Sequence, residues 1–152
     1  VSLFIEIAKA FTPVFIGMSY STQYGEPLSQ IGLVLLASAP IIGHAWSPFL
    51  KFKGGKALAA SWGSWIAITG GLALPIGCIL LGTMHLLQKN HAITVTACLL
   101  GFLIIFFPMK PEISIVIFWV LNILVVIHKH KTEYSNGIQL RRWIDRFNRV
   151  SN

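Results

Sequence analysis

Charged residues are scarce in this chain of 152 residues. They make up 11% of it, whereas 55% of the residues are hydrophobic and the mean hydropathy is +0.71. A typical soluble domain carries about 25% charged residues. A soluble core of this size cannot hide so much apolar surface, but a lipid bilayer removes the need to hide it. The composition therefore excludes an ordinary soluble domain and predicts an integral membrane protein.

Acidic residues and cysteines are also few. Five acidic residues stand against 12 basic ones, which gives a net charge of +7. Because the basic residues lie beside apolar runs and do not alternate with base-stacking aromatics in a polar domain, we assign this excess to membrane orientation and anionic ligands rather than to nucleic acid. Cys78 and Cys98 lie inside apolar runs without Cys-x-x-Cys spacing, which indicates core residues rather than a disulfide or a metal pair.

Residues 1–18 lack the marks of a cleavable signal peptide, since they contain neither a basic leading region nor a small-residue cleavage site. The chain begins at Val1 directly in an apolar run. We therefore expect its natural beginning to lie further upstream.

The apolar runs predict an all-α bundle of six transmembrane helices, because a span needs roughly 17 to 25 apolar residues. The predicted spans are 1–18, 31–50, 56–70, 72–88, 92–107 and 113–128. We therefore divide the chain into a polytopic membrane domain, residues 1–135, and a C-terminal segment, residues 136–152. In that segment apolar residues at helical spacing oppose arginines, which predicts an amphipathic helix lying on an anionic membrane surface.

The basic residues are distributed unequally between the two ends of the predicted bundle. With six spans, the loops at 51–56 and 88–91 and the tail after residue 128 share one side of the membrane. Lys110 falls on the other side. Because cytoplasmic loops carry the excess of Lys and Arg, we expect the basic side to be cytoplasmic. Its basic residues are Lys51, Lys53, Lys56, Lys89, Lys129, Lys131, Arg141, Arg142, Arg146 and Arg149.

Three lysines surround a glycine pair between the second and third predicted spans: Lys51, Lys53 and Lys56 flank Gly54 and Gly55. The glycines allow a tight turn with open amides, and a helix that begins at Lys56 would direct the positive end of its dipole to the same place. Such a turn suits a phosphate, a phosphorylated substrate or a lipid headgroup. The alternative is a polar hairpin whose lysines are set by topology alone.

This turn is not a Walker A loop. Leu50 stands where the first glycine of that motif would fall, and no Ser or Thr follows Lys56.

Two histidines lie at the cytoplasmic ends of predicted spans, beside the lysines. His44 sits just inside the second span, and His128 closes the sixth. Either side chain could orient a phosphate or a hydroxyl there. The pair formed by His128 and His130 has no third cluster of Cys or carboxylate ligands, so we expect neither a metal nor another cofactor.

The segment from residue 43 to residue 61 resembles the second motif of the bacterial acyl-phosphate:glycerol-3-phosphate acyltransferases. That motif runs Gly-His-x-Phe, a few residues, then Leu-Lys-Phe-Lys-Gly-Gly-Lys-Gly-Val-Ala-Thr. Gly43-His44 and the run from Phe49 to Lys56 fall in register, whereas Trp46, Ala57 and Ala60 replace the Phe, a Gly and the Thr.

The other two family motifs are matched less well. His128 and Lys129 fit the start of the third motif, but His130 and Lys131 replace its Glu and Asn. The first motif, a loop with Ser and Arg or Lys, has no counterpart here. We expect that loop, and the first span of the family's seven-helix architecture, to lie before Val1.

The resemblance implies acyl transfer from a fatty acyl-phosphate to the 1-hydroxyl of glycerol 3-phosphate, giving lysophosphatidic acid at the cytoplasmic face of a bacterial inner membrane. The implied partners are these two substrates and membrane lipids, with no nucleic acid and with the oligomeric state left open. His44 and His128 would orient phosphate or the attacking hydroxyl. The residues assigned to phosphate binding are Lys51, Lys53, Gly54, Gly55, Lys56 and Lys129.

Two alternatives remain beside this activity. One is an inactive or divergent member of the family. The other is a small transporter or lipid-binding membrane protein with an anion-binding cytoplasmic loop. No internal symmetry accompanies the helix-breaking prolines and glycines, which favours the enzyme over the transporter.

Overall fold

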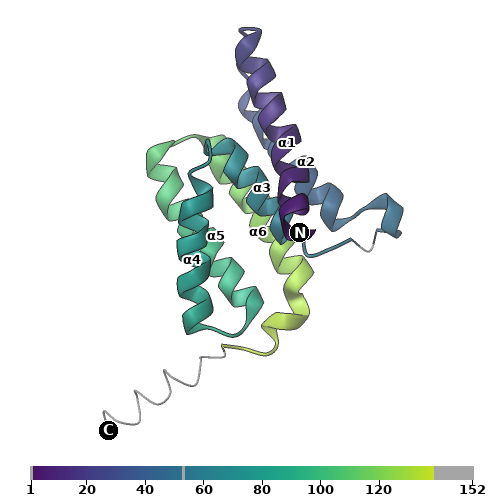
Figure 1. The fold of residues 1–152 in the computed structure, drawn as a ribbon, viewed down its shortest axis with the longest axis vertical. Coiled ribbons are helices and arrows are strands. Elements are labelled where there is room, and N and C mark those ends of the chain that lie inside the picture. The colour runs from purple at the N-terminus through teal and green to yellow at the C-terminus, as the bar shows by residue number, and fades with distance from the viewer. Residues whose placement is uncertain (1, 53, 139–152) are drawn as a thin grey trace.

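A computed structural model describes residues 2–52 and 54–138 of the protein and shows an all-α bundle (Figure 1). This confirms the predicted fold class. The predicted amphipathic helix lies almost wholly in residues 139–152, outside the described part of the chain. In chain order the helices are α1 (Ser2–Gln23), α2 (Gln30–Ala45), the 3-10 turn η1 (Pro48–Leu50), α3 (Leu58–Ile68), α4 (Ala73–Leu87), α5 (His91–Met109) and α6 (Ile113–Tyr134).

The helices differ in whether they can cross a bilayer alone. Four stretches in the described residues are long and apolar enough: α1, α2 continued through η1, α5 and α6. The protein is therefore a multi-pass membrane protein. α3 has 11 residues and α4 has 15, so at 1.5 Å per residue they rise about 17 and 23 Å, less than the hydrocarbon thickness of about 30 Å.

α3 and α4 form a short hairpin. Gly70 and Gly71 join them with φ angles of 62° and 96°, a left-handed conformation that glycine adopts without strain. Almost every residue of α3 is buried, whereas α4 buries only Ala73 and Gly77. α3 is thus enclosed by the other helices, and α4 lies at the edge of the bundle.

Trp65 of α3 occupies the centre of the core. Its side chain is fully buried, and its ring centroid lies 5.4 Å from that of Phe102, 5.9 Å from that of Phe106 and 5.0 Å from that of Phe118. Lipid is as apolar as these side chains, so close packing rather than the hydrophobic effect holds such helices together. The aromatic cluster therefore fixes α3 against α5 and α6.

A single glycine sets the closeness of α1 and α3. A Cβ atom added at Gly63 would overlap the backbone carbonyl oxygen of Ile7 and would lie 2.9 Å from the backbone nitrogen of Phe11. A small residue is required where two helix backbones approach this closely.

The starts of α3 and α5 and the end of α6 meet at one end of the bundle. Asn90, the N-cap of α5, donates hydrogen bonds from its side chain to the backbone carbonyls of Glu133 and Gly137, at 2.8 and 2.9 Å. Lys56, just ahead of α3, forms an ion pair with Glu133. Figure 1 shows the α1–α2 loop and the α3–α4 and α5–α6 turns at the opposite end. This is the grouping of loops that the charge distribution predicted.

Several predicted boundaries are wrong by a few residues. α1 continues to Gln23 instead of ending at residue 18. α6 continues to Tyr134 instead of ending at residue 128, because its last turns, although polar in sequence, are held by contacts to Asn90 and Lys56. α3 begins at Leu58 instead of Lys56, because Ala57 has a φ of 58° and cannot continue a right-handed helix.

We expect Gly63→Ala to destabilise the protein by about 1–3 kcal/mol, since the added methyl group forces α1 away from α3. The measurement is the midpoint of unfolding in detergent. Gly82→Ala is the matched control, because a Cβ atom there meets no atom within 4 Å. Equal midpoints for the two variants would show that the close approach of α1 and α3 does not contribute to stability.

Candidate functional site

The lysine turn, residues 51–57, has a strained backbone. Lys51, Phe52 and Ala57 have φ angles of 51°, 60° and 58°. Residues other than glycine rarely adopt this left-handed conformation, which costs on the order of 1–3 kcal/mol each and persists only where surrounding structure enforces it. Such strain is typical of functional sites, although Lys53 itself lies outside the described residues.

The glycine pair allows the turn to lie directly against His44. A Cβ atom at Gly54 would overlap the backbone carbonyl oxygen of His44, and one at Gly55 would lie 2.5 Å from His44 Nε2. The positive φ angles fall on other residues of the turn, so the glycines are needed here for close approach. His44, in the last turn of α2, therefore presents its ring to the lysine turn.

Lys56 reaches from the turn to the end of α6. Its Nζ pairs with one carboxylate oxygen of Glu133, and the other oxygen lies 3.0 Å from Nδ1 of His130. The side chain of Lys56 is 56% exposed and that of Glu133 is 26% exposed, whereas His130 is fully buried. Glu133 thus links an accessible cation to a buried imidazole.

Two of the predicted site residues, His128 and Lys129, lie against Trp46 at the end of α2. The ring centroid of His128 is 5.7 Å from that of Trp46, the residue that ends α2. Lys129 Nζ lies 4.9 Å from the centroid of the same indole, a cation–π contact. Both residues hold the exit of α2 against α6, at the edge of the site rather than beside Lys56.

The remaining predicted residue, Lys51, caps the C-terminal end of η1 with its side chain exposed. The structure therefore brings together His44, Gly54, Gly55 and Lys56, sets His128 and Lys129 beside them, and leaves Lys51 on the rim.

A chain of hydrogen bonds fixes the start of α3 from within the core. Asn122 of α6 donates to Ser61 Oγ at 2.8 Å, and Ser61 Oγ donates to the backbone carbonyl of Ala57 at 2.8 Å. Asn122 and Ser61 are both buried. Because Ala57 is the left-handed residue that ends the lysine turn, these bonds help to hold the turn in its strained form.

The sequence analysis assigned no site role to four residues that organise this end of the bundle. They are Asn90, Asn122, His130 and Glu133. Two signals could have found them. A polar Asn122 in the middle of an apolar span needs a partner inside the bundle. His130 and Glu133 are three residues apart, which places them on one face if the helix continues past residue 128.

Comparison with known proteins supports the resemblance seen in the motif. The family model described as "Glycerol-3-phosphate acyltransferase" matches residues 1–139. A curated relative from Thermotoga maritima, glycerol-3-phosphate acyltransferase 1, is 34% identical over 123 residues, which cover 70% of this chain and 60% of the relative. A glycerol-3-phosphate acyltransferase from Chromobacterium violaceum is 31% identical over 133 residues, covering 88% and 62%. The chain thus spans about three fifths of these relatives.

Two solved structures share the fold. Both are of PlsY (YgiH), an integral membrane glycerol 3-phosphate acyltransferase, one in its glycerol 3-phosphate form and one in its lysophosphatidic acid form. The TM-scores are 0.72 and 0.73 at 20% sequence identity. The matches cover 88% of this chain and 64% and 65% of the respective structures.

We expect a coupling free energy of about 0.5–1 kcal/mol between Lys56 and Glu133, because both side chains are partly exposed and solvent screens their attraction. The measurement is a double-mutant cycle of unfolding midpoints with Lys56→Met, Glu133→Gln and the double variant. A second cycle with Lys110→Met, at the opposite end of the bundle, is the control and should be additive. Additivity in both cycles would show that the ion pair does not stabilise the fold.

Proposed function

This chain belongs to the glycerol-3-phosphate acyltransferase family, and we propose that it transfers the acyl group of a fatty acyl-phosphate to the 1-hydroxyl of glycerol 3-phosphate, giving lysophosphatidic acid. The observation that carries the proposal is the folded arrangement of the family-like motif. His44, the glycine pair and Lys56 meet the end of α6 at one end of a membrane bundle. This location suits substrates that are dianionic at one end and aliphatic at the other.

In the proposed site the lysine turn binds phosphate. Lys56 Nζ is accessible and is paired with a single carboxylate, so a phosphate dianion can compete for it with stronger charge-assisted hydrogen bonds. Lys51 and Lys53 belong to the same turn, and Lys129 lies nearby against Trp46. Gly54 and Gly55 present backbone without side chains, which lets a ligand approach closely.

The proposed reaction needs little covalent help from the protein. The 1-hydroxyl attacks the carbonyl carbon of the acyl-phosphate, the bond from that carbon to the phosphate oxygen breaks, and the hydroxyl proton ends on the released phosphate. Because the donor is already activated, positioning and charge neutralisation can provide much of the rate. His44 orients the attacking hydroxyl from beside Gly55, and His128 assists phosphate orientation from the edge of the site.

His130 has a positioning role in this account. His130 contacts Glu133, and Glu133 pairs with Lys56. These contacts fix the position of the Lys56 ammonium group before substrate binds. The full burial of His130 keeps it from touching the substrates directly.

We also propose that the site faces the cytoplasm of a bacterial cell, with the protein in the inner membrane. The support is the charge distribution. Among the described basic residues, Lys9 lies within α1 and Lys110 lies at the opposite end of the bundle, whereas those at the site end are Lys51, Lys56, Lys89, Lys129 and Lys131. An excess of lysine is typical of cytoplasmic loops.

The direct test is acyl transfer from palmitoyl-phosphate to radiolabelled glycerol 3-phosphate by the purified product of the whole reading frame. We expect labelled lysophosphatidate with this donor. A folded protein that forms no product would contradict the proposal and would leave a divergent family member whose lysine turn binds an anion for another purpose.

We expect Lys56→Ala to raise the KM for glycerol 3-phosphate about 10- to 100-fold, because a hydrogen bond to a charged group contributes roughly 1.5–3 kcal/mol. Steady-state kinetics with varied glycerol 3-phosphate measures this change. Lys110→Ala removes a lysine at the opposite end of the bundle and should leave the KM within about twofold, as expected for a distant surface charge. An equal change of KM in the two variants would show that Lys56 does not bind the phosphate.

We expect Gly55→Ala to lower kcat about tenfold or more, because the added methyl group displaces the His44 ring and such misplacement is costly for positioning. Gly43→Ala is the matched control within the same motif, since a Cβ atom there meets nothing within 4 Å. If both variants keep the parent's kcat, the contact of His44 with the lysine turn is not needed for catalysis.

A further inference from the structure

The turn η1 and the residues directly after it expose large apolar side chains at the site end of the bundle. Phe49 is 97% exposed, Leu50 is 58% exposed and Phe52 is 65% exposed. Lys51 lies between them in the sequence and is also exposed. Figure 1 shows the chain that follows α2 projecting sideways, on the side of the bundle away from α4. Exposed apolar side chains that gather in one place mark an interaction surface.

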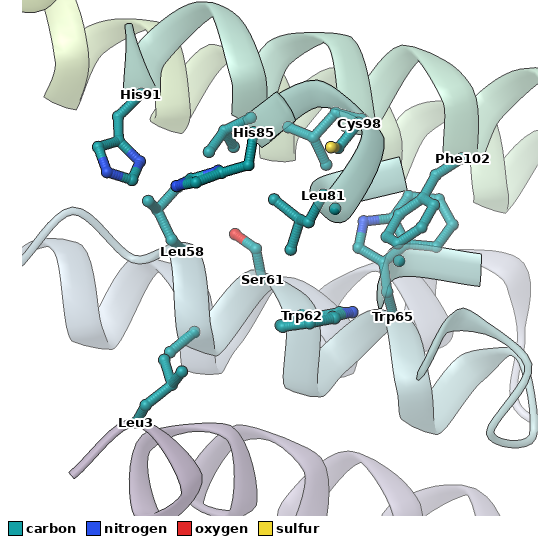
Figure 2. Close-up of a pocket in the computed structure, with 15 residues that line it drawn as sticks. Leu3, Leu58, Ser61, Trp62, Trp65, Leu81, His85, His91, Cys98 and Phe102 are labelled. Carbon is teal, nitrogen blue, oxygen red and sulfur yellow. The ribbon is translucent and has the colours of Figure 1, made fainter. Parts of the chain in front are cut away.

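The apolar cavity of the bundle does not receive these side chains. This cavity of about 390 Å³ lies between α3, α4 and α5, and Trp62 and Trp65 belong to its wall (Figure 2). Neither η1 nor Phe52 contributes a residue to its lining. The apolar side chains of the turn therefore face away from the interior of the described bundle.

The length of α2 determines how deep the turn lies in the membrane. α2 has 16 residues and rises about 24 Å at 1.5 Å per residue, whereas the hydrocarbon layer is about 30 Å thick. The apolar stretch reaches 21 residues, Gln30–Leu50, only when α2 is continued through η1. When α2 begins at one boundary of the hydrocarbon layer, η1 falls at the other boundary, where acyl chains meet headgroups.

The backbone of the turn suits this depth. The amides of Leu50, Lys51 and Phe52 each donate a hydrogen bond to a carbonyl within the turn, at 3.0 or 3.1 Å. Pro48 has no amide hydrogen to satisfy. Because an unpaired backbone donor is costly away from water, hydrogen bonds that close within the turn let these four residues contact lipid.

Lys51 adds a positive charge beside the apolar side chains. Within residues 2–52 and 54–138, the ion pairs join Glu133 to Lys56 and His130, so Lys51 has no carboxylate partner there. A segment that combines Phe and Leu with Lys lies in the membrane interface, and anionic headgroups attract it. The lysine stem can lie along acyl chains while its ammonium group remains among the headgroups.

We propose that η1 anchors the lysine turn in the membrane. Phe49, Leu50 and Phe52 insert among the acyl chains of the leaflet at the site end, and Lys51 binds the phosphate of an anionic lipid headgroup. Core hydrogen bonds hold the end of the turn at Ala57, whereas the lipid holds its beginning. The inference concerns a lipid partner and does not depend on the proposed acyl transfer.

Site-specific quenching by brominated lipids tests both parts of the proposal. The product of the whole reading frame, with its native cysteines replaced by alanine and a bimane fluorophore at Phe49→Cys, is reconstituted in vesicles. These contain phosphatidylglycerol and phosphatidylcholine, and one or the other carries bromine on its acyl chains. We expect both lipids to quench the fluorophore. The relative association constant should favour phosphatidylglycerol roughly fivefold, as expected for one lysine near an anionic surface.

Three further variants provide the comparison. In Lys51→Gln the fluorophore at Phe49→Cys should still be quenched, but the preference for phosphatidylglycerol should fall to less than about twofold. Lys110→Gln, at the opposite end of the bundle, should leave the preference unchanged. A fluorophore at Ile104→Cys, an exposed apolar position of α5, should be quenched equally by the two lipids.

Three results would overturn the proposal. If neither lipid quenches the fluorophore at Phe49→Cys while both quench it at Ile104→Cys, η1 lies in water or beneath another segment of the protein. If the two lipids quench at Phe49→Cys equally, the turn does not select anionic headgroups. A preference that survives Lys51→Gln would show that Lys51 does not bind the headgroup.

Discussion

The contacts that Glu133 makes with Lys56 and Asn90 join the lysine turn and the start of α5 to the end of α6, the parts of the chain that form the proposed site. The lysine turn contains three residues in left-handed conformations and cannot be stable in isolation. The end of α6 is polar and would fray if nothing held it. Lys56 and Asn90 both bind Glu133, one through its carboxylate and one through its backbone carbonyl. A single residue of α6 therefore anchors the turn before α3 and the start of α5.

The membrane explains why the polar groups are arranged in this way. Inside a bilayer a polar side chain needs a protein partner. The described part of the bundle accordingly has a mostly apolar interior, with an aromatic cluster around Trp65, and its ion pairs lie at one end. Asn122 is a buried polar residue in the middle of α6, and its side chain donates a hydrogen bond to Ser61. Ser61 in turn donates to the backbone carbonyl of Ala57, so this buried polar pair helps to hold the end of the lysine turn.

The short helix α3 lies next to both the lysine turn and the apolar cavity. Its beginning faces the lysine turn, where charge is needed, and its next turns line the apolar cavity. Because α3 is buried among the other helices, the lysine turn and the apolar cavity keep a fixed distance from each other.

The sequence was sufficient for the six helices, for the grouping of their ends and for the motif that carries Lys56. Apolar runs and lysine asymmetry report on these features directly. The sequence was not sufficient to choose between His128 and His130. Residues two apart on a helix point about 200° apart, so only one of them can face Lys56, and the choice depends on the rotation of α6. The close approach of the glycine pair to His44 could not be predicted from the sequence either, because it is a tertiary contact.

The most direct test of this account is the distance between η1, which leads into the lysine turn, and the end of α6. Spin labels at Phe49→Cys and Lys131→Cys, two exposed positions, report it by pulsed electron resonance after Cys78 and Cys98 are replaced by alanine. A turn docked on α6 predicts one narrow distance distribution, which persists when glycerol 3-phosphate is added. A broad distance distribution that does not change when glycerol 3-phosphate is added would show that the turn and the end of α6 do not form one site.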